Sequence, residues 1–456
     1  MDELNLASVG LIAGITVAAS WASASTLSSY KEKVFFVCNM FGLFFYCGIG
    51  YGYSDVVPPQ YIYYYTVFIG AYCSAFILVL RGITRPAQGR VRLASDEGSV
   101  WRRVVRFAPV IMGVYLGLIS ISLVYPEVVI SRLWAPPFPS VFEWWNEGLG
   151  RALTEWEMVS QSFQALIFPL FLVALSRVRG SILGTVALII LPFYIEYCST
   201  GYTGRSTMLA VLVLIFVPLW LEYPTYRRRL VLILAIASPL LLATMYVWSA
   251  SREGELAGID VPIWQMAFGL LAGEMSFPTY SEKILEFGRG IDLTQYFLWI
   301  VTLPVPRFVM PNKPTVQLNF EIAEVLGGIL PGESGFTVLL PGPITESVYI
   351  FGGDYFWLHA LFVGSLAAVA VRVSLDDRRC VFVYAYFLYA FSYVFARAGA
   401  GGLMPIVVNQ FLSYYLLYVY GRHVSRSKTG GSPIGEMVRE SNGSGASARP
   451  SWQAQK

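Results

Sequence analysis

The long apolar runs of this chain constrain its fold more than any other feature of the sequence. A run of about 20 apolar residues can cross the hydrocarbon core of a bilayer as a helix, whose backbone hydrogen bonds are satisfied internally. Charged residues make up only 13% of the 456 residues, against about 25% in soluble domains. The sequence therefore predicts an all-α polytopic membrane protein with about 11 transmembrane helices. The spans are expected at roughly 5–25, 34–53, 61–80, 107–124, 160–176, 181–198, 207–221, 230–248, 347–370, 381–396 and 403–420.

Basic residues orient these spans, because short loops rich in lysine and arginine stay on the cytoplasmic side of the membrane. The loop 81–106 carries seven arginines and is placed in the cytoplasm. Alternation of the spans then puts the other short basic loops on the same side, with the N-terminus outside and the C-terminus inside. A cleavable signal peptide over residues 1–24 is the alternative for the first run. The acidic start and the arginine-rich loop both oppose it.

Two stretches between spans are expected outside the membrane on the outer side. The predicted transmembrane domain covers residues 1–425, with outer loops at 125–159 and 249–346. The larger loop contains two apolar segments, 263–273 and 296–303, which are too short to cross and are expected to be interfacial or re-entrant helices. Residues 426–456 are rich in serine and glycine, which predicts a disordered cytoplasmic tail.

A proline-rich stretch, LPVPRFVMPNKPT at 303–315, lies within the larger outer loop. Proline fixes φ and lacks a backbone donor, so this stretch cannot be a spanning helix. It must lie outside the bilayer or line a cavity walled by protein. Because two cations, Arg307 and Lys313, stand among the prolines, we interpret the stretch as the rigid rim of an extracytoplasmic anion-binding cavity.

Nine of the 32 lysines and arginines are predicted to face outside, against the usual bias. Those in the segments GYTGRST, SASREGE, the proline-rich stretch and FARAGAGG are the strongest candidates for function, and glycines flank three of these segments. Guanidinium groups pair bidentately with phosphate oxygens and stay charged. Several of them together could stabilise a departing polyprenyl diphosphate without a metal. The candidate cations are Arg205, Arg252, Arg307, Lys313 and Arg397.

Carboxylates near these cations are candidates for proton transfer, because inverting sugar transfer needs a base for the acceptor hydroxyl. Glu346, at the start of the predicted span 347–370, is the first candidate, and a solvated interfacial acid is the alternative reading. Glu196 is expected to pair with Arg205 or Arg397. His359 lies about 20 Å beyond Glu346 along a helix, so we interpret it as a helix-packing histidine away from the outer mouth.

Missing motifs argue against several classes of function. The chain has two histidines, and its five cysteines are scattered without a CxxC pair, so neither a histidine-rich metal site nor a disulfide framework is expected. It lacks the P-loop of ATP-driven pumps, and it lacks a DxD motif for metal-dependent nucleotide-sugar chemistry. No cofactor is therefore expected, and nucleic acid is not an expected partner.

The order of these motifs resembles a known family. PVPRFVMPNKP followed by ESVYIFG at 346–352 resembles the bacterial oligosaccharide repeat unit polymerases of the Wzy type, the O-antigen polymerases. GYTGRST is similar to their short arginine-bearing loop, although relatives often show Arg-Gly where this chain has Gly-Arg-Ser. The likeness covers about 195–400. Related O-antigen ligases are expected to carry a histidine in the large outer loop, and its absence from 249–346 favours a polymerase.

The resemblance implies a metal-independent membrane glycosyltransferase with a GT-C-like fold in the bacterial plasma (inner) membrane. It would join undecaprenyl-diphosphate-linked oligosaccharide repeat units into an O-antigen, capsule or exopolysaccharide chain, with a chain-length regulator as a further candidate partner. Glu346 and Arg205 would be the catalytic residues. The substrate-binding residues would be Arg307, Lys313, Arg397, Arg252 and Glu196. A transporter or flippase of lipid-linked oligosaccharide, a ligase-like glycosyltransferase and a structural scaffold remain open alternatives.

Overall fold

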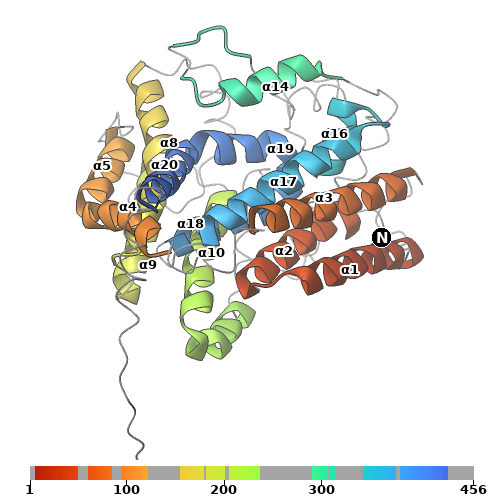
Figure 1. The fold of residues 1–456 in the computed structure, drawn as a ribbon, viewed down its shortest axis with the longest axis horizontal. Coiled ribbons are helices and arrows are strands. Elements are labelled where there is room, and N and C mark those ends of the chain that lie inside the picture. Colours follow the sequence, from red (N-terminus) through yellow and green to blue (C-terminus); the bar gives the residue numbers. More distant parts are fainter. Residues whose placement is uncertain are drawn as a thin grey trace, which may run out of the picture.

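The computed structural model describes residues 6–49, 60–84, 94–121, 155–178, 181–200, 205–236, 290–306, 309–314, 340, 342–375 and 380–429. Every regular element in these ranges is helical, and the helices pack as a bundle (Figure 1). The all-α prediction is therefore confirmed over these ranges. Of the predicted outer loop 125–159, residues 125–154 lie outside the described residues, and 155–159 are helical as the start of α8. The predicted apolar segment 263–273 and the tail beyond Thr429 also lie outside the described residues.

Most helices follow the predicted apolar runs, whereas α4 lies in the predicted basic loop 81–106. Those of the first half are α1 (Leu6–Thr26), α2 (Tyr30–Leu43) with a π-helical turn Phe44–Gly48, α3 (Gln60–Thr84), α4 (Ala94–Arg106), α5 (Ala108–Ile121), α8 (Glu155–Leu175), α9 (Ile182–Thr200) and α10 (Arg205–Glu222). Those of the second half are α14 (Leu293–Thr302), α16 (Gly342–Phe351), α17 (Phe356–Leu375), α18 (Val381–Tyr389), α19 (Ala396–Met404) and α20 (Leu412–Thr429). The short helix predicted at 296–303 is thus confirmed as α14. Residues 426–429, predicted to belong to the disordered tail, are helical, because α20 continues to Thr429.

Four helical stretches of the described chain are long and apolar enough to cross a membrane: Val9–Thr26, Gln60–Gly82, Phe356–Leu375 and Val381–Gln410. Two further pairs qualify only if each is counted as one bent span. These pairs, bent by 65° and 113°, are Val100–Arg106 with Ala108–Ser120 and Ser206–Glu222 with Pro224–Ile236. The described residues therefore hold four to six candidate spans, and the eleven spans and the GT-C-like fold remain predictions.

Two predicted boundaries need correction. The span expected at 347–370 is broken, because Gly352 adopts φ +78° and a turn separates α16 from α17. Glycine has no Cβ and so accepts this left-handed backbone without strain. Conversely, the loop expected between 396 and 403 is helical. One helical path runs from Val381 to Gln410, and Gly399 is the residue at which it leaves the helical conformation. Alanine, the strongest helix former, alternates with glycine there and keeps the path helical.

The tightest packing in the described bundle joins α3 to α17, which lie side by side in Figure 1. Small residues allow this approach: a Cβ added to Gly364 would lie 2.6 Å from the Tyr72 carbonyl oxygen. Aromatic rings fill the adjoining core, where Tyr72 stacks on Phe395 with ring centroids 6.2 Å apart. Large apolar side chains also lie exposed along the outside of α1 and α3, including Val17 and Leu78. Such exposed apolar surface suits contact with lipid.

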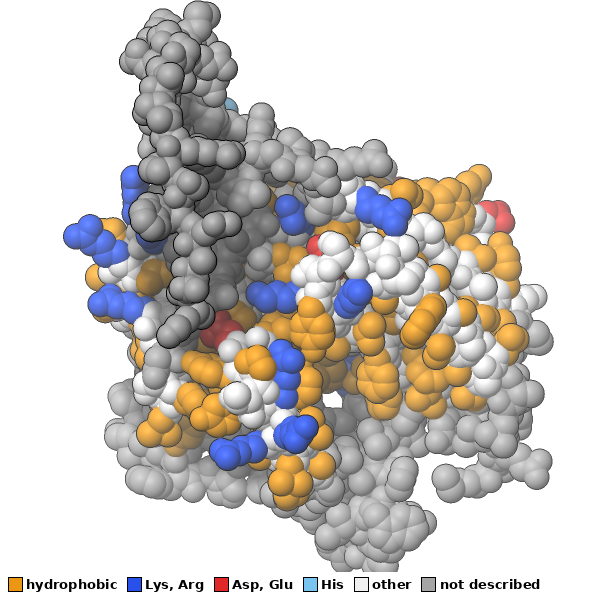
Figure 2. Space-filling model, turned by 60° about the horizontal axis from the view of Figure 1, so that its bottom comes forward, with side chains coloured by type: hydrophobic (Ala, Val, Ile, Leu, Met, Phe, Trp, Pro, Cys, Tyr) orange, Lys and Arg blue, Asp and Glu red, His pale blue; other side chains and the backbone are white. Residues whose placement is uncertain are grey.

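Several predicted cytoplasmic loops meet at one end of the described structure, here named the basic end. The Tyr384 hydroxyl, on α18, donates to the carbonyl of Lys31 at 2.8 Å. The Trp220 indole donates to the Tyr30 hydroxyl at 3.1 Å, and the Arg227 guanidinium covers both rings. Figure 2 shows lysine and arginine side chains distributed over this part of the surface among apolar ones.

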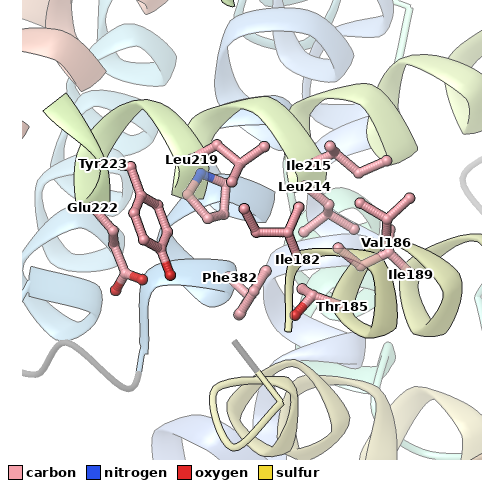
Figure 3. Close-up of a pocket in the computed structure, with 11 residues that line it drawn as sticks. Ile182, Thr185, Val186, Ile189, Leu214, Ile215, Leu219, Glu222, Tyr223 and Phe382 are labelled. Atoms are coloured by element: carbon pink, nitrogen blue, oxygen red, sulfur yellow. The ribbon is translucent and has the colours of Figure 1, made fainter. Parts of the chain in front are cut away.

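A small apolar groove lies at the basic end between α9, α10 and the start of α18 (Figure 3). Ile182 and Leu219 lie on opposite walls, and Glu222 and Tyr223 close one end. The groove therefore brings the α8–α9 connection close to the C-terminal end of α10. In that connection Arg177 donates to the carbonyl of Arg106 at 3.4 Å.

The glycine contact between α3 and α17 generates a stability prediction. Gly364→Ala should destabilise the protein by about 1–3 kcal/mol, the usual cost of overpacking, because its methyl group would collide with the backbone of α3. Gly70→Ala on α3 is the matched control, since a Cβ there meets nothing within 4 Å. Thermal unfolding in detergent should show a lower Tm for the first variant alone. Equal Tm values for both variants would contradict the tight α3–α17 contact.

Candidate functional site

The candidate site is built around Glu346, which lies in the middle of α16. All ten residues of this helix are buried, and Glu346 itself is only 1% exposed. The helix begins at Gly342, whose φ of +72° turns the chain, and Pro343 follows. Proline suits the first turn of a helix because its missing N–H would have no helical partner there. The interpretation of Glu346 as a solvated interfacial acid is therefore wrong: the carboxylate lies inside the protein.

The Glu346 carboxylate binds the backbone where the Val381–Gln410 helix breaks. The Ala400 N–H donates to Oε2 at 2.6 Å, and the Gly401 N–H donates to Oε1 at 2.8 Å. Both amides become available because Gly399 leaves the helical conformation, with φ +66° and ψ −159°. The first amides of a helical segment have no carbonyl partner within it and favour negative charge. A side chain from another helix thus supplies the missing acceptors.

Gly399 is required twice in this arrangement. Its backbone angles lie in a region that essentially only glycine occupies. In addition, a Cβ at this position would overlap Oε2 of Glu346. The close approach of the carboxylate to the backbone therefore depends on the absence of a side chain at residue 399.

Burial sets the proton affinity of this carboxylate. Removal from water raises the pKa of Glu346 to about 8, and the hydrogen bonds from Gly401 and Ala400 oppose part of that rise. Desolvation disfavours the charged form, whereas donated hydrogen bonds favour it. With a pKa near neutrality, Glu346 can exchange a proton at physiological pH, as a general base or acid requires.

Arg397 lies two residues before Gly399 on the same helical path and is partly buried. The Arg397 side chain is close enough to interact electrostatically with the Tyr389 hydroxyl. The same hydroxyl is hydrogen-bonded to the Ser206 side chain. Ser206 belongs to the first turn of α10, which begins at Arg205. The structure therefore places Ser206, at the start of α10, beside the helical path that carries Tyr389 and Arg397, and the shared site stays a prediction.

Lys313, a predicted substrate contact, has a local role. Its ammonium group donates to the carbonyls of Leu303 and Val305 at 2.8 and 3.1 Å, just past the C-terminal end of α14. Cations at this end of a helix stabilise its unpaired carbonyls. Lys313 therefore holds the proline-rich stretch against α14. The remaining predicted contacts, namely Arg252, Arg307 and the side chains of Arg205 and Glu196, lie outside the described residues.

A second polar cluster adjoins Glu346 and was missed by the sequence analysis. Ser347 is hydrogen-bonded to Nδ1 of His359 at 2.7 Å, and Nε2 of His359 is hydrogen-bonded to the Tyr296 hydroxyl at 3.0 Å. His359 was expected about 20 Å from Glu346, on the assumption of one straight helix. The break after α16 brings it to the neighbouring residue instead. The glycine pair in IFGGDYFW was the sequence signal for that break.

The described residues contain no group of three histidine, cysteine, aspartate or glutamate side chains placed to hold a metal ion. The polar groups at the site are a buried carboxylate, the backbone amides at the helix break, an arginine and the histidine cluster.

The chain matches no protein-family model, no curated protein and no solved structure. Over the described residues the chain is helical, with four to six helices long and apolar enough to cross a membrane, and its function has to be argued from the site.

The Gly399 geometry predicts a large effect of a single methyl group. Gly399→Ala should lose both the backbone conformation and the Glu346 contact, whereas Gly352→Ala carries only the left-handed strain, since a Cβ there meets nothing within 4 Å. That strain costs about 1–2 kcal/mol, so the Tm of Gly399→Ala should fall clearly further than that of Gly352→Ala. Similar Tm values would contradict the contact between Glu346 and the broken helix.

The raised pKa of Glu346 predicts a pH-dependent stability. The folded pKa of about 8 exceeds the ordinary value of 4.5, so the folded state binds the proton more tightly than the unfolded state. This contribution is complete below about pH 4.5 and is lost as the pH rises through about 8. The wild-type Tm should therefore fall between about pH 4.5 and pH 8 relative to that of Glu346→Gln. Gly352→Ala keeps the carboxylate, so its Tm should depend on pH as that of the wild type does. Parallel curves of Tm against pH for the wild type and Glu346→Gln would contradict the raised pKa of Glu346.

Proposed function

We propose that the chain is a membrane glycosyltransferase that polymerises undecaprenyl-diphosphate-linked oligosaccharide repeat units into a surface polysaccharide on the outer face of the bacterial plasma membrane. One observation carries the proposal: the Glu346 carboxylate contacts the backbone of Ala400 and Gly401. This contact joins the segment ESVYIFG, which holds the expected base, to the segment FARAGAGG, which holds an expected diphosphate ligand, Arg397.

The chemistry asks for a base and for cations. Glu346 takes the proton of the acceptor hydroxyl while the hydroxyl oxygen attacks the anomeric carbon of the donor sugar. The bond from that carbon to the diphosphate oxygen breaks, and the lipid diphosphate leaves with the bonding electrons. Arg397, with Arg205 at the start of the neighbouring α10, stabilises the charge on the departing diphosphate. A direct attack of this kind inverts the configuration of the donor sugar.

The distance between the site and the basic end supports an outward-facing site. Tyr384 contacts Lys31 at the basic end, and Arg397 follows thirteen residues later on the same helical path. At 1.5 Å per residue this path covers about 20 Å, most of the hydrocarbon thickness. With the basic end in the cytoplasm, Arg397 then lies toward the outer side, where repeat units are joined.

A deletion strain tests the function directly. A polymerase defect should remove long surface chains and keep products that carry a single repeat unit. A flippase defect should remove both, and a ligase defect should leave polymer on the lipid carrier. Surface polysaccharide and lipid-linked material, separated by gel electrophoresis, distinguish the three outcomes. Long chains of normal abundance in the deletion strain would refute the proposal.

Complementation of that strain tests Arg397. Arg397→Gln should reduce long-chain product by about 10- to 100-fold, because a hydrogen bond to a charged group contributes about 1.5–3 kcal/mol. Arg228→Gln is the matched control, since Arg228 is exposed at the basic end. Equal expression of both variants must be confirmed by immunoblot. Normal chain lengths with Arg397→Gln would exclude Arg397 from the site.

A transporter of lipid-linked oligosaccharide is the second candidate, and one observation favours it. Glu346 lies where α16 and the second half of a broken helix meet, and secondary transporters place their substrate sites between such discontinuous helices. Purified protein in liposomes separates the two functions. Transfer of the lipid-linked unit between leaflets without chain elongation would support transport and contradict the polymerase.

A further inference from the structure

We propose that Tyr296, His359 and Ser347 form a directed hydrogen-bond chain that positions Glu346, which makes His359 a positioning residue of the site. The chain links three helices, because Tyr296 lies on α14, Ser347 on α16 and His359 on α17. Tyr296, Ser347 and His359 are each fully buried, so water does not compete for these bonds.

The direction of the chain follows from the number of protons available. The Ser347 hydroxyl has a single proton, which it donates to the carbonyl of Pro343 in the preceding turn. Its oxygen can therefore only accept from Nδ1 of His359, at 2.7 Å, so Nδ1 carries the hydrogen. In the neutral ring Nε2 is then the acceptor, and the Tyr296 hydroxyl donates to it at 3.0 Å. One tautomer of His359 satisfies all three groups.

The chain acts on Glu346 because Ser347 is its direct neighbour in α16. Successive residues of an α-helix are about 100° apart around the axis, so Glu346 and Ser347 face different partners. With Ser347 held by α17 and Glu346 held by Ala400 and Gly401, α16 cannot rotate without breaking bonds on one of these faces. The chain therefore fixes the direction in which the carboxylate points.

The described segment from Gly290 to α14 is tied to the same helix. The Gly290 N–H donates to the carbonyl of Tyr349 at 2.9 Å, and a Cβ at Gly290 would overlap the Tyr349 ring. Asp292 then caps the N-terminus of α14, because its carboxylate accepts from the Thr294 N–H. Tyr296 is thus presented to His359 by a segment that is itself anchored on α16, which makes α14 a cover over the polar cluster.

The tautomer can be tested without any assumption about function. The chain contains two histidines, so ¹⁵N-histidine labelling of the His423→Ala variant in detergent leaves His359 as the single observed ring. Nδ1 should give a pyrrole-type signal and Nε2 a pyridine-type signal. Tyr296→Phe should shift the Nε2 signal, and Ser347→Ala should shift the Nδ1 signal. The opposite tautomer, or unchanged shifts in both variants, would overturn the chain.

The effect on Glu346 needs a second readout, chosen so that it does not depend on the proposed function. Tyr296→Phe and Ser347→Ala should shift the pH range over which the Tm falls as Glu346 loses its proton. Tyr414→Phe is the matched control, because it removes an equally buried hydroxyl whose partner is the Val373 carbonyl. An unchanged pH profile in both site variants would show that the chain is only structural and would overturn the positioning role.

The consequence for catalysis rests on the proposed function. Elongation of the lipid-linked repeat unit purified from the same strain should show a kcat lowered about tenfold or more in Tyr296→Phe and Ser347→Ala, with KM little changed, while Tyr414→Phe elongates normally. This corresponds to about 1.4 kcal/mol of lost positioning. Normal kcat in both site variants would refute the role. If the wild type does not elongate, the polymerase proposal fails, and the ¹⁵N and pH experiments still decide the positioning chain.

Discussion

The structure depends on one buried interaction, in which the amides of Ala400 and Gly401, at the break of a helix, donate hydrogen bonds to the Glu346 carboxylate. A helix that breaks inside a membrane protein leaves amides without carbonyl partners, and no water is present in hydrocarbon to satisfy them. A buried carboxylate has the reciprocal problem, because it loses its hydration. Each group supplies what the other lacks, and Gly399 permits their approach because it has no side chain. The pairing explains how two otherwise unfavourable features coexist in one bundle.

The same interaction connects structure to chemistry. Burial keeps the proton affinity of Glu346 near neutrality, while the two amides prevent a still larger rise. Arg397 lies on the turn just before the break, so a cation and a carboxylate of suitable proton affinity are presented from one short segment and its partner helix. The cluster of Tyr296, His359 and Ser347 holds the opposite face of α16. In this arrangement two backbone amides hold the carboxylate, and α14 covers the polar cluster beside it.

Sequence reasoning located most of the secondary structure but missed how helices meet. Most predicted spans coincide with helix where the chain is described, because long apolar runs leave the backbone no other way to satisfy its hydrogen bonds; the exception is the span 347–370, which breaks at Gly352. The number of spans was not confirmed, since bends and short helices depend on packing partners far away in the sequence. Lys313 was chosen for its charge, yet it binds carbonyls of its own segment. His359 was placed away from the site because one helix was assumed where Gly352 turns the chain.

Hydrophobicity and the distribution of arginine and lysine are local properties. They were enough for the sequence to predict apolar helices able to cross a membrane and to name Glu346 and Arg397 as candidates. The tertiary structure alone decided that Glu346 is buried, that its partners are the amides of Ala400 and Gly401, and that His359 lies beside it. These contacts join residues that are 12 to 63 positions apart. A pairing over such separations is set by the packing of whole helices, and no local pattern of residues encodes it.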